Sequence, residues 1–157
     1  MKKSTLAFVA AFLSLACAGS TLVLAQPSSE IELTRSAIQA ERQALVTANL
    51  GLTEDEGLAF WPVYRDYRVE MARVGDRLVK LITDYAASWE ALPDAQASAL
   101  VRDLLAVQQD ALRVKEKFAP RFEKVISAKS VFRFYQIENK LDAFVMMGVV
   151  EQIPLVK

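Results

Sequence analysis

The sequence predicts an all-α fold, a long bent antiparallel helical hairpin with two flanking helices, and we expect this unit to dimerise. Apolar residues recur at alternating spacings of three and four over several segments, which is the period of an amphipathic helix. The 157 residues include only five glycines and five prolines. With 53% hydrophobic residues, the chain is also too apolar to remain disordered.

Residues 1–25 have the features of a secretory signal peptide. Two lysines precede an apolar run over residues 6–18, and small side chains at Val23 and Ala25 suit cleavage before Gln26. A membrane anchor is the alternative, but the apolar run is short for a span and polar residues follow it. We therefore expect cleavage, which leaves a single all-helical domain over residues 26–157.

The export signal predicts a periplasmic protein without disulfides. The sole cysteine, Cys17, lies in the segment that cleavage removes. Cys17 also allows a lipoprotein interpretation, which we favour less because Ser14 stands where leucine is usual. Since no cysteine then remains, the fold must be stabilised by packing alone.

The charge of the chain points away from nucleic acid as a partner. Lysine and arginine number 19, as do aspartate and glutamate, and cleavage leaves seventeen basic and nineteen acidic residues. Such a chain has no net positive field to attract DNA, RNA or anionic lipid. We expect no nucleic-acid binding and no stable membrane insertion after signal cleavage.

The sequence offers no recognisable enzyme active site, and we expect no catalytic residue, no cofactor and no metal. Histidine is absent, which excludes a Ser-His-Asp triad and histidine-containing zinc sites. Gly51 and Gly57 flank acids rather than lysine, so they do not form a phosphate loop. A calcium site at Glu54, Asp55 and Glu56 is conceivable, but these residues lack the alternating ligand pattern of a calcium loop.

A first helix is expected over residues 30–49. Ser29 can accept a backbone hydrogen bond at its start, and Gly51 suits the position just past its end. Its apolar positions recur every seven residues, at Ile31, Ile38, Leu45 and Leu52.

A second and longer helix is expected from Thr53 to about Ala91. Thr53 and Glu56 form a capping-box pattern, and three acids in the first turn suit the positive end of the helix dipole. Its apolar seam consists of Phe60, Tyr64, Tyr67, Met71, Val74, Leu78, Leu81 and Tyr85. The charges between these positions are expected to form a solvated face with weak ion pairs.

A third helix is expected after the break at Leu92 and Pro93, with Asp94 as its cap. Because the break is so short, this helix must run antiparallel to the second. Its seam consists of Ala97, Leu100, Leu104, Val107, Ala111, Val114 and Phe118. A second apolar line widens this face enough to receive another helix, and consists of Val101, Leu105 and Leu112.

A fourth helix is expected over residues 128–151, with Ser127 as a possible cap. Its seam consists of Phe134, Ile137, Leu141 and Phe144. The apolar tail that follows cannot be helical at Pro154.

Two prolines fall within predicted helices, at Pro62 and Pro120. Each removes one backbone hydrogen bond and should kink its helix, unless the helix simply ends there. We favour kinks because the apolar pattern continues past each proline. Both lie at a similar distance from the turn at Pro93, so the kinks would bow the hairpin at one level.

Aromatic residues gather near this expected bend. Phe60, Trp61, Tyr64, Phe118 and Phe122 are our candidates to line or support a surface for clients or partners. Core packing is the alternative, above all for the seam residues. Trp61 lies beside the seam, where a half-exposed aromatic side chain can contact another protein.

The segment Leu52-Thr53-x-x-Glu56, which opens a long helix in an exported helical protein, resembles the Leu-Thr-x-x-Gln motif of the Spy/CpxP family. Glu56 stands where that motif has glutamine. The resemblance implies a periplasmic, cradle-shaped dimer that serves as an ATP-independent chaperone or envelope-stress accessory protein. Such a protein would hold unfolded or envelope proteins on a concave helical surface. The alternative is a non-enzymatic structural or regulatory partner of one specific envelope protein.

Overall fold

The computed structural model describes residues 40–150 and 153–156, with the side chains of 148–150 left out. These residues belong to one compact unit, Ala37–Lys157. The predicted signal peptide, Ser29 and the first ten residues of the first predicted helix lie outside the described residues, and so do Ile31 and Ile38.

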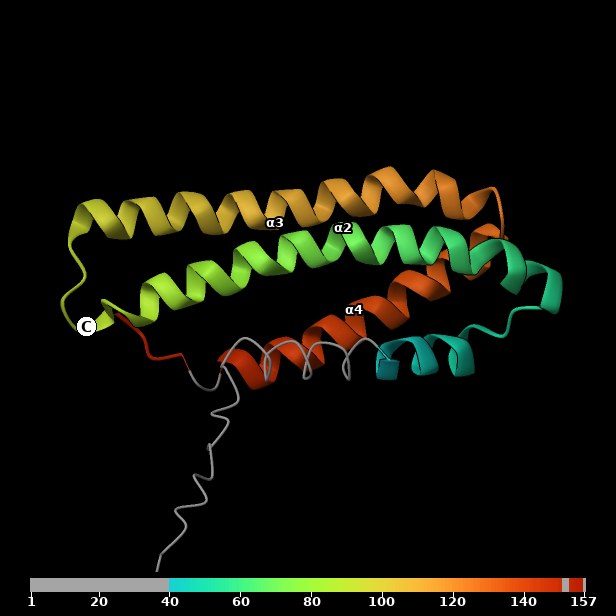
Figure 1. Ribbon diagram of the computed structural model, residues 1–157, viewed down its shortest axis with the longest axis horizontal. Coiled ribbons are helices and arrows are strands. Elements are labelled where there is room, and N and C mark those ends of the chain that lie inside the picture. Colours follow the sequence, from blue (N-terminus) through green and yellow to red (C-terminus); the bar gives the residue numbers. More distant parts are fainter. Residues whose placement is uncertain (1–39, 151–152, 157) are drawn as a thin grey trace, which may run out of the picture. The chain divides into compact units, whose positions relative to one another are not determined.

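The described residues form four helices and hold no strand, which confirms the predicted all-α class. Residues 40–50 are helical and precede α2 (Glu54–Ala86), and a short 3-10 turn, η1 (Trp89–Ala91), leads to α3 (Asp94–Glu123). The chain then continues into α4 (Ala128–Val150). Figure 1 shows the two long helices α2 and α3 packed side by side. Within the part of the chain that the structure describes, no helix has the length and hydropathy that a membrane crossing requires.

The start of α2 has the predicted capping box. The Glu56 backbone N–H donates to Thr53 Oγ1 at 3.3 Å, and the Thr53 N–H donates to Glu56 Oε2 at 3.0 Å. Gly51 has φ of 67°, the left-handed conformation that suits a residue just past a helix end. Residues 51–53 therefore redirect the chain between two helices whose backbone groups are locally satisfied.

The connection between α2 and α3 differs in detail from the expectation. α2 ends at Ala86 rather than near Ala91, and η1 takes up the last turn. Asp94 is not the cap of α3: the capping position is Pro93, without a side-chain hydrogen bond, and Asp94 is the first helical residue. Proline fits there because its fixed φ and missing N–H cost little at a helix start.

Neither proline ends its helix: Pro62 lies inside α2 and Pro120 inside α3.

Ser127 caps α4 as predicted, since Ser127 Oγ accepts from the Ser130 N–H at 3.1 Å. α4 is described as far as Val150, and the predicted last residue, 151, lies outside the described residues.

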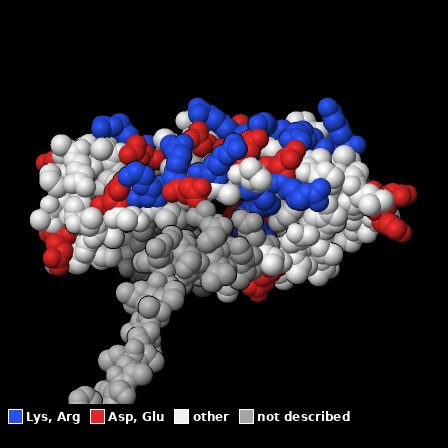
Figure 2. All heavy atoms as spheres, viewed as in Figure 1, with Lys and Arg blue, Asp and Glu red and all other residues white. Residues whose placement is uncertain are grey.

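Ion pairs fix the register between α2 and α3. Along α2 the paired residues advance by four and then seven positions, while their partners on α3 retreat by four and then seven, so the helices are antiparallel. The pairs are Asp66–Arg121 at 2.6 Å, Glu70–Lys117 at 2.7 Å and Arg77–Asp110. Figure 2 shows basic and acidic side chains intermixed on the face that these helices present.

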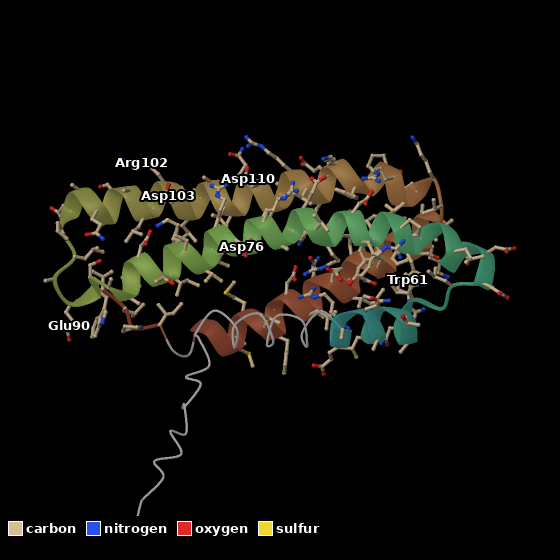
Figure 3. The ribbon with its side chains drawn as sticks, viewed as in Figure 1. Trp61, Asp76, Glu90, Arg102, Asp103 and Asp110 are labelled. Carbon is tan, nitrogen blue, oxygen red and sulfur yellow. The ribbon has the colours of Figure 1, made fainter. Side chains whose placement is uncertain are left out.

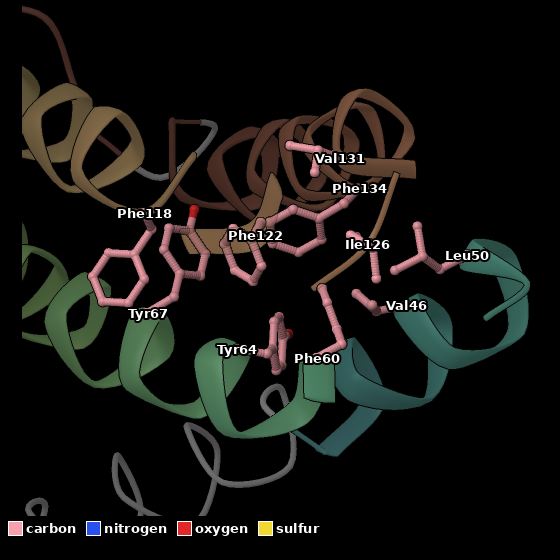
Figure 4. Packing of buried hydrophobic residues seen from close by; sticks show 10 residues of the cluster. All are labelled: Val46, Leu50, Phe60, Tyr64, Tyr67, Phe118, Phe122, Ile126, Val131 and Phe134. Carbon is pink, nitrogen blue, oxygen red and sulfur yellow. The ribbon is translucent and has the colours of Figure 1, made fainter. Parts of the chain in front are cut away.

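The core is an aromatic cluster between the start of α2, the end of α3 and the start of α4. Phe122 and Phe134 lie at its centre, with ring centroids 4.6 Å apart. Segment 40–50 closes the cluster on one side (Figure 4). Its buried members are Val46, Leu50, Phe60, Tyr64, Tyr67, Phe118, Phe122, Ile126, Val131 and Phe134.

Three predicted apolar lines turn out differently. In segment 40–50 the buried side chains are Arg42, Val46 and Leu50, whereas Leu45 is 39% exposed. Phe144 is 76% exposed, because a helix of 3.6 residues per turn drifts away from a strict seven-residue repeat. The second line on α3 is solvent-exposed at Val101, Leu105 and Leu112, and no described helix covers it.

Candidate functional site

An open groove of about 590 Å³ lies between α2, α3 and the C-terminal half of α4. We call it the hairpin groove. Its lining is mainly apolar, with Met71, Val74, Gly75, Leu78, Leu81, Ile82 and Tyr85 of α2, Leu104, Val107 and Ala111 of α3, Val145 and Met146 of α4, and Ile153. The charged and amide side chains of the lining are Arg42, Arg68, Gln108 and Asp142. The α2 seam therefore serves two purposes: its first three aromatic residues fill the core, and the rest line the groove.

Part of the groove wall is formed by a cluster of charged side chains. Glu138 of α4 is fully buried and accepts from Arg42 Nη1 at 3.0 Å and from Arg68 Nη1 at 3.1 Å. Arg42 lies on segment 40–50 and Arg68 on α2. The Tyr64 hydroxyl also donates to Glu138, at 3.4 Å. One carboxylate thus joins three helical segments.

The cluster extends to the groove wall through Asp142. Arg42 pairs with Asp142 at 3.0 Å, and Lys115 of α3 approaches the same carboxylate at 3.6 Å. Lys115 also donates to Asn139 Oδ1 at 2.9 Å, and its backbone carbonyl accepts from the Tyr135 hydroxyl at 2.8 Å. The charged cluster therefore connects α4 with α3 as well.

Burial dominates the electrostatics of these groups. Burial raises the pKa of Glu138, although Arg68 and Arg42 act in the opposite direction. Burial alone would lower the pKa of Arg42, but Glu138 and Asp142 raise it above its ordinary value. Burial also raises the pKa of Tyr135 to about 12, with Glu138 adding to the shift.

Three buried polar atoms near Glu138 find no hydrogen-bond partner among the described residues. They are Arg42 Nε, Arg68 Nε and Tyr67 Oη. An unpaired buried donor costs free energy because its hydration is not replaced. The charged cluster therefore stabilises the fold by less than its number of ion pairs suggests.

The predicted aromatic surface lies mostly inside the molecule. Phe60, Tyr64, Phe118 and Phe122 come together as expected, but each is at most 3% exposed and belongs to the core. They can support a surface but do not present one. Trp61 is part-exposed and packs edge-on against Phe60 at 5.1 Å. Figure 3 places Trp61 at the end of α2 that lies opposite to the η1 turn, where Glu90 is labelled.

The motif residues Leu52, Thr53 and Glu56 lie at the start of α2, away from the hairpin groove. Thr53 and Glu56 bond to each other, and Leu52 packs against the core. Their geometry accounts for a helix start. Among the described residues, no group of three or more acidic or other metal-ligating side chains is placed to hold a metal ion.

Sequence reasoning assigned Arg68 to a solvated face and missed Glu138 and Arg42. A signal was present, because Glu138 lies seven residues beyond Val131 and four beyond Phe134, and therefore shares a helix face with these two buried side chains. Arg42 likewise precedes Val46 by four. Charged residues at seam positions on two separate helices indicate a buried pair.

The arrangement can bind apolar groups. Both oxygens of Glu138 accept hydrogen bonds from the chain's own side chains, so this carboxylate is not available as a base. The hairpin groove is open and lined by flexible aliphatic side chains. The chain matches no protein-family model, and no curated protein or solved structure is significantly similar to it.

Proposed function

We propose that the protein is a periplasmic, ATP-independent chaperone or envelope-stress accessory protein of the Spy/CpxP type, which holds unfolded segments in the hairpin groove. The observation that carries this proposal is the groove itself: an open, mainly apolar cavity of about 590 Å³ on a fold with a separate core. A cavity of this size is within the range of ligand sites in proteins.

The chemistry of the lining suits many partners held weakly. Met71 and Met146 are unbranched and can adapt to side chains of different shapes. The charged side chains of the lining, Arg42, Arg68 and Asp142, are already paired within the charged cluster, so the apolar stretch of the groove would select little between sequences. Holding of this kind follows from burial of apolar area and needs no nucleotide.

A second apolar surface extends the area available to clients. Val101, Leu105 and Leu112 are each more than half exposed on α3. Contiguous exposed apolar side chains of this kind mark contact sites. In the proposed dimer, this line is the surface that a second copy or a client would cover.

A second candidate function is docking of one specific envelope protein through an amphipathic helix. The groove follows α2 from Met71 to Tyr85, which is about 21 Å or four helical turns. A partner helix would place apolar side chains in such a groove at spacings of three and four. A pull-down from envelope extracts that yields one stoichiometric partner would favour this function over many weak clients.

The test measures light scattering while a denatured model client is diluted with and without the protein, in the absence of nucleotide. Suppression of aggregation near equimolar ratio is expected. The variant Leu78→Asn/Leu104→Asn places polar groups in the groove and should abolish suppression. Leu58→Asn/Val79→Asn is the matched control, because these side chains are 71% and 47% exposed and do not line the groove.

The variant Trp61→Ala separates the groove from the aromatic end of α2. If clients bind in the groove, this variant should suppress aggregation as well as the native chain does. A loss of suppression with unchanged helix content would instead place the contact at Trp61. Absence of suppression by the native chain at several-fold excess would contradict the chaperone proposal.

A further inference from the structure

Although the chain carries no net charge, its basic and acidic residues are unevenly distributed, and the outer face of α4 is basic. Lys129, Arg133 and Lys140 follow one another at spacings of four and seven, which places them on one side of the helix. All three are exposed and make no ion pair with any described residue. This differs from the α2–α3 face, where bases and acids pair in a regular series.

Large apolar side chains share this outer face of α4. Phe132 is 66% exposed, Phe144 is 76% exposed and Met147 is 59% exposed. Phe144 follows Lys140 by four positions and Met147 by seven, so they continue the basic line toward the end of the helix. Exposed phenylalanine is costly in water and is expected where another surface covers it.

No acid interrupts this face. The acids of α4 between residues 128 and 147 are Glu138, which is fully buried, and Asp142, which pairs with Arg42. Both point toward the charged cluster and away from the basic line. The outer face of α4 therefore combines unpaired positive charge with apolar side chains.

We infer that the outer face of α4 binds an anionic lipid surface, with Phe132, Phe144 and Met147 entering the boundary between headgroups and acyl chains. A helix lying in this plane needs apolar side chains on one face and lysine or arginine at the headgroup level. The long basic side chains can reach anionic headgroups while their stems lie along the apolar surface.

A lipid surface fits this face better than a protein partner does. Protein interfaces are centred on well-packed pockets, and these side chains do not line the hairpin groove. A bilayer surface requires no pocket and accepts interspersed basic and aromatic side chains. This surface is distinct from the hairpin groove, so it extends the proposed function and does not depend on it.

The experiment is sedimentation of the full chain with vesicles. One set contains phosphatidylcholine alone, and the other contains roughly a third phosphatidylglycerol. Residues 6–18 are apolar and would add binding to any vesicle, so the readout is the difference between the two lipid compositions. We expect stronger binding to anionic vesicles, and loss of this difference at about 1 M salt.

Charge-neutral variants locate the binding surface. Lys129→Gln/Arg133→Gln/Lys140→Gln should weaken binding to anionic vesicles roughly a hundredfold, about fivefold for each charge. The matched control, Arg65→Gln/Arg73→Gln/Arg102→Gln, removes the same charge from exposed positions on α2 and α3 and should change binding less than about threefold. Circular dichroism of both variants should equal that of the native chain.

A second pair of variants tests the apolar contribution. Phe144→Ser/Met147→Ser should also reduce the binding, whereas Leu58→Ser/Val79→Ser should not. Equal losses in the two charge variants would overturn the inference, since net charge alone would then explain binding. Equal binding of the native chain to neutral and anionic vesicles would overturn it too. A third outcome would also overturn it. If the Lys129→Gln/Arg133→Gln/Lys140→Gln variant binds vesicles like the native chain but no longer suppresses aggregation of an acidic client, the outer face of α4 binds proteins instead.

Discussion

Arg42 and Glu138 are separated by 96 positions and form a buried ion pair with 3.0 Å between Arg42 Nη1 and Glu138 Oε2. Arg68 approaches the same oxygen at 3.1 Å. The pair joins the helical segment before α2 to the last helix of the fold. It lies beside the aromatic core and at the hairpin groove, and with Arg68 it links α4 to α2.

Replacing Glu138 by alanine should lower the free energy of unfolding by about 3 kcal/mol, because Arg68 then loses its carboxylate partner and Arg42 keeps only Asp142. Urea unfolding followed by circular dichroism measures the loss. Gln136→Ala, at an exposed position on the same helix, is the control and should change stability by less than about 0.5 kcal/mol. The double variant Arg42→Met/Glu138→Leu should lose less unfolding free energy than the single variants Arg42→Met and Glu138→Leu lose together. Additive losses would mean that the two residues act independently.

The pH dependence of stability should differ between the native chain and Glu138→Gln. Burial raises the pKa of Glu138, so the folded state binds this proton more tightly than the unfolded state does. Its contribution to stability is then fully present below the ordinary pKa of about 4.3, and is lost as pH rises through the raised value. Relative to Glu138→Gln, the native chain should lose stability over this range. Unfolding free energies at a series of pH values measure this, and a relative gain with rising pH would show that the two arginines outweigh burial.

Two phenylalanines on α4, two positions apart, should respond very differently to truncation. Phe134 is fully buried against Phe122, whereas Phe132 is 66% exposed. Phe134→Ala should cost about 3 to 5 kcal/mol through lost burial and a cavity. Phe132→Ala should change stability by less than about 0.5 kcal/mol. Denaturant midpoints of the two variants measure this, and similar losses would contradict the position of α4 on the core.

The capping box at the start of α2 should be measurable by itself. Thr53→Ala removes the acceptor for the Glu56 N–H and should cost about 1 kcal/mol. Glu56→Gln keeps a side-chain oxygen that can accept from the Thr53 N–H, so it should cost less than about 0.5 kcal/mol. Thermal unfolding compares them. A larger loss in Glu56→Gln than in Thr53→Ala would mean that the negative charge, rather than the hydrogen bond, matters at this helix start.

Much of the helical framework follows from local sequence rules. The box at Thr53 and Glu56, the left-handed Gly51 and the cap at Ser127 are short-range interactions, and each was predicted correctly. The hairpin followed from apolar spacing and a short break. The predicted cap of α3 was wrong by one residue, Asp94 instead of Pro93, because several residues near a helix start can satisfy the same backbone groups.

The candidate site was harder to predict because its partners come from distant segments. Spacing shows that Phe60 and Phe122 lie on the apolar faces of their helices. It does not show that both side chains are buried against α4. Arginine and glutamate side chains are usually solvated. Arg42, Arg68 and Glu138 form a cluster only because the fold brings their three helical segments together. The hairpin groove likewise depends on how far α4 diverges from α3, which no single helix encodes.

The buried aromatic side chains are concentrated where α2 starts and α3 ends, which leaves the η1 end with partly exposed contacts. Local opening requires least free energy where few buried contacts are lost. Amide hydrogens near η1 should therefore exchange with solvent much faster than those around Phe60 and Phe122. The last turns of α2 and the first turns of α3, next to η1, could therefore open locally many times within one folded lifetime. A bound polypeptide could then enter and leave the groove while the aromatic end keeps the protein folded.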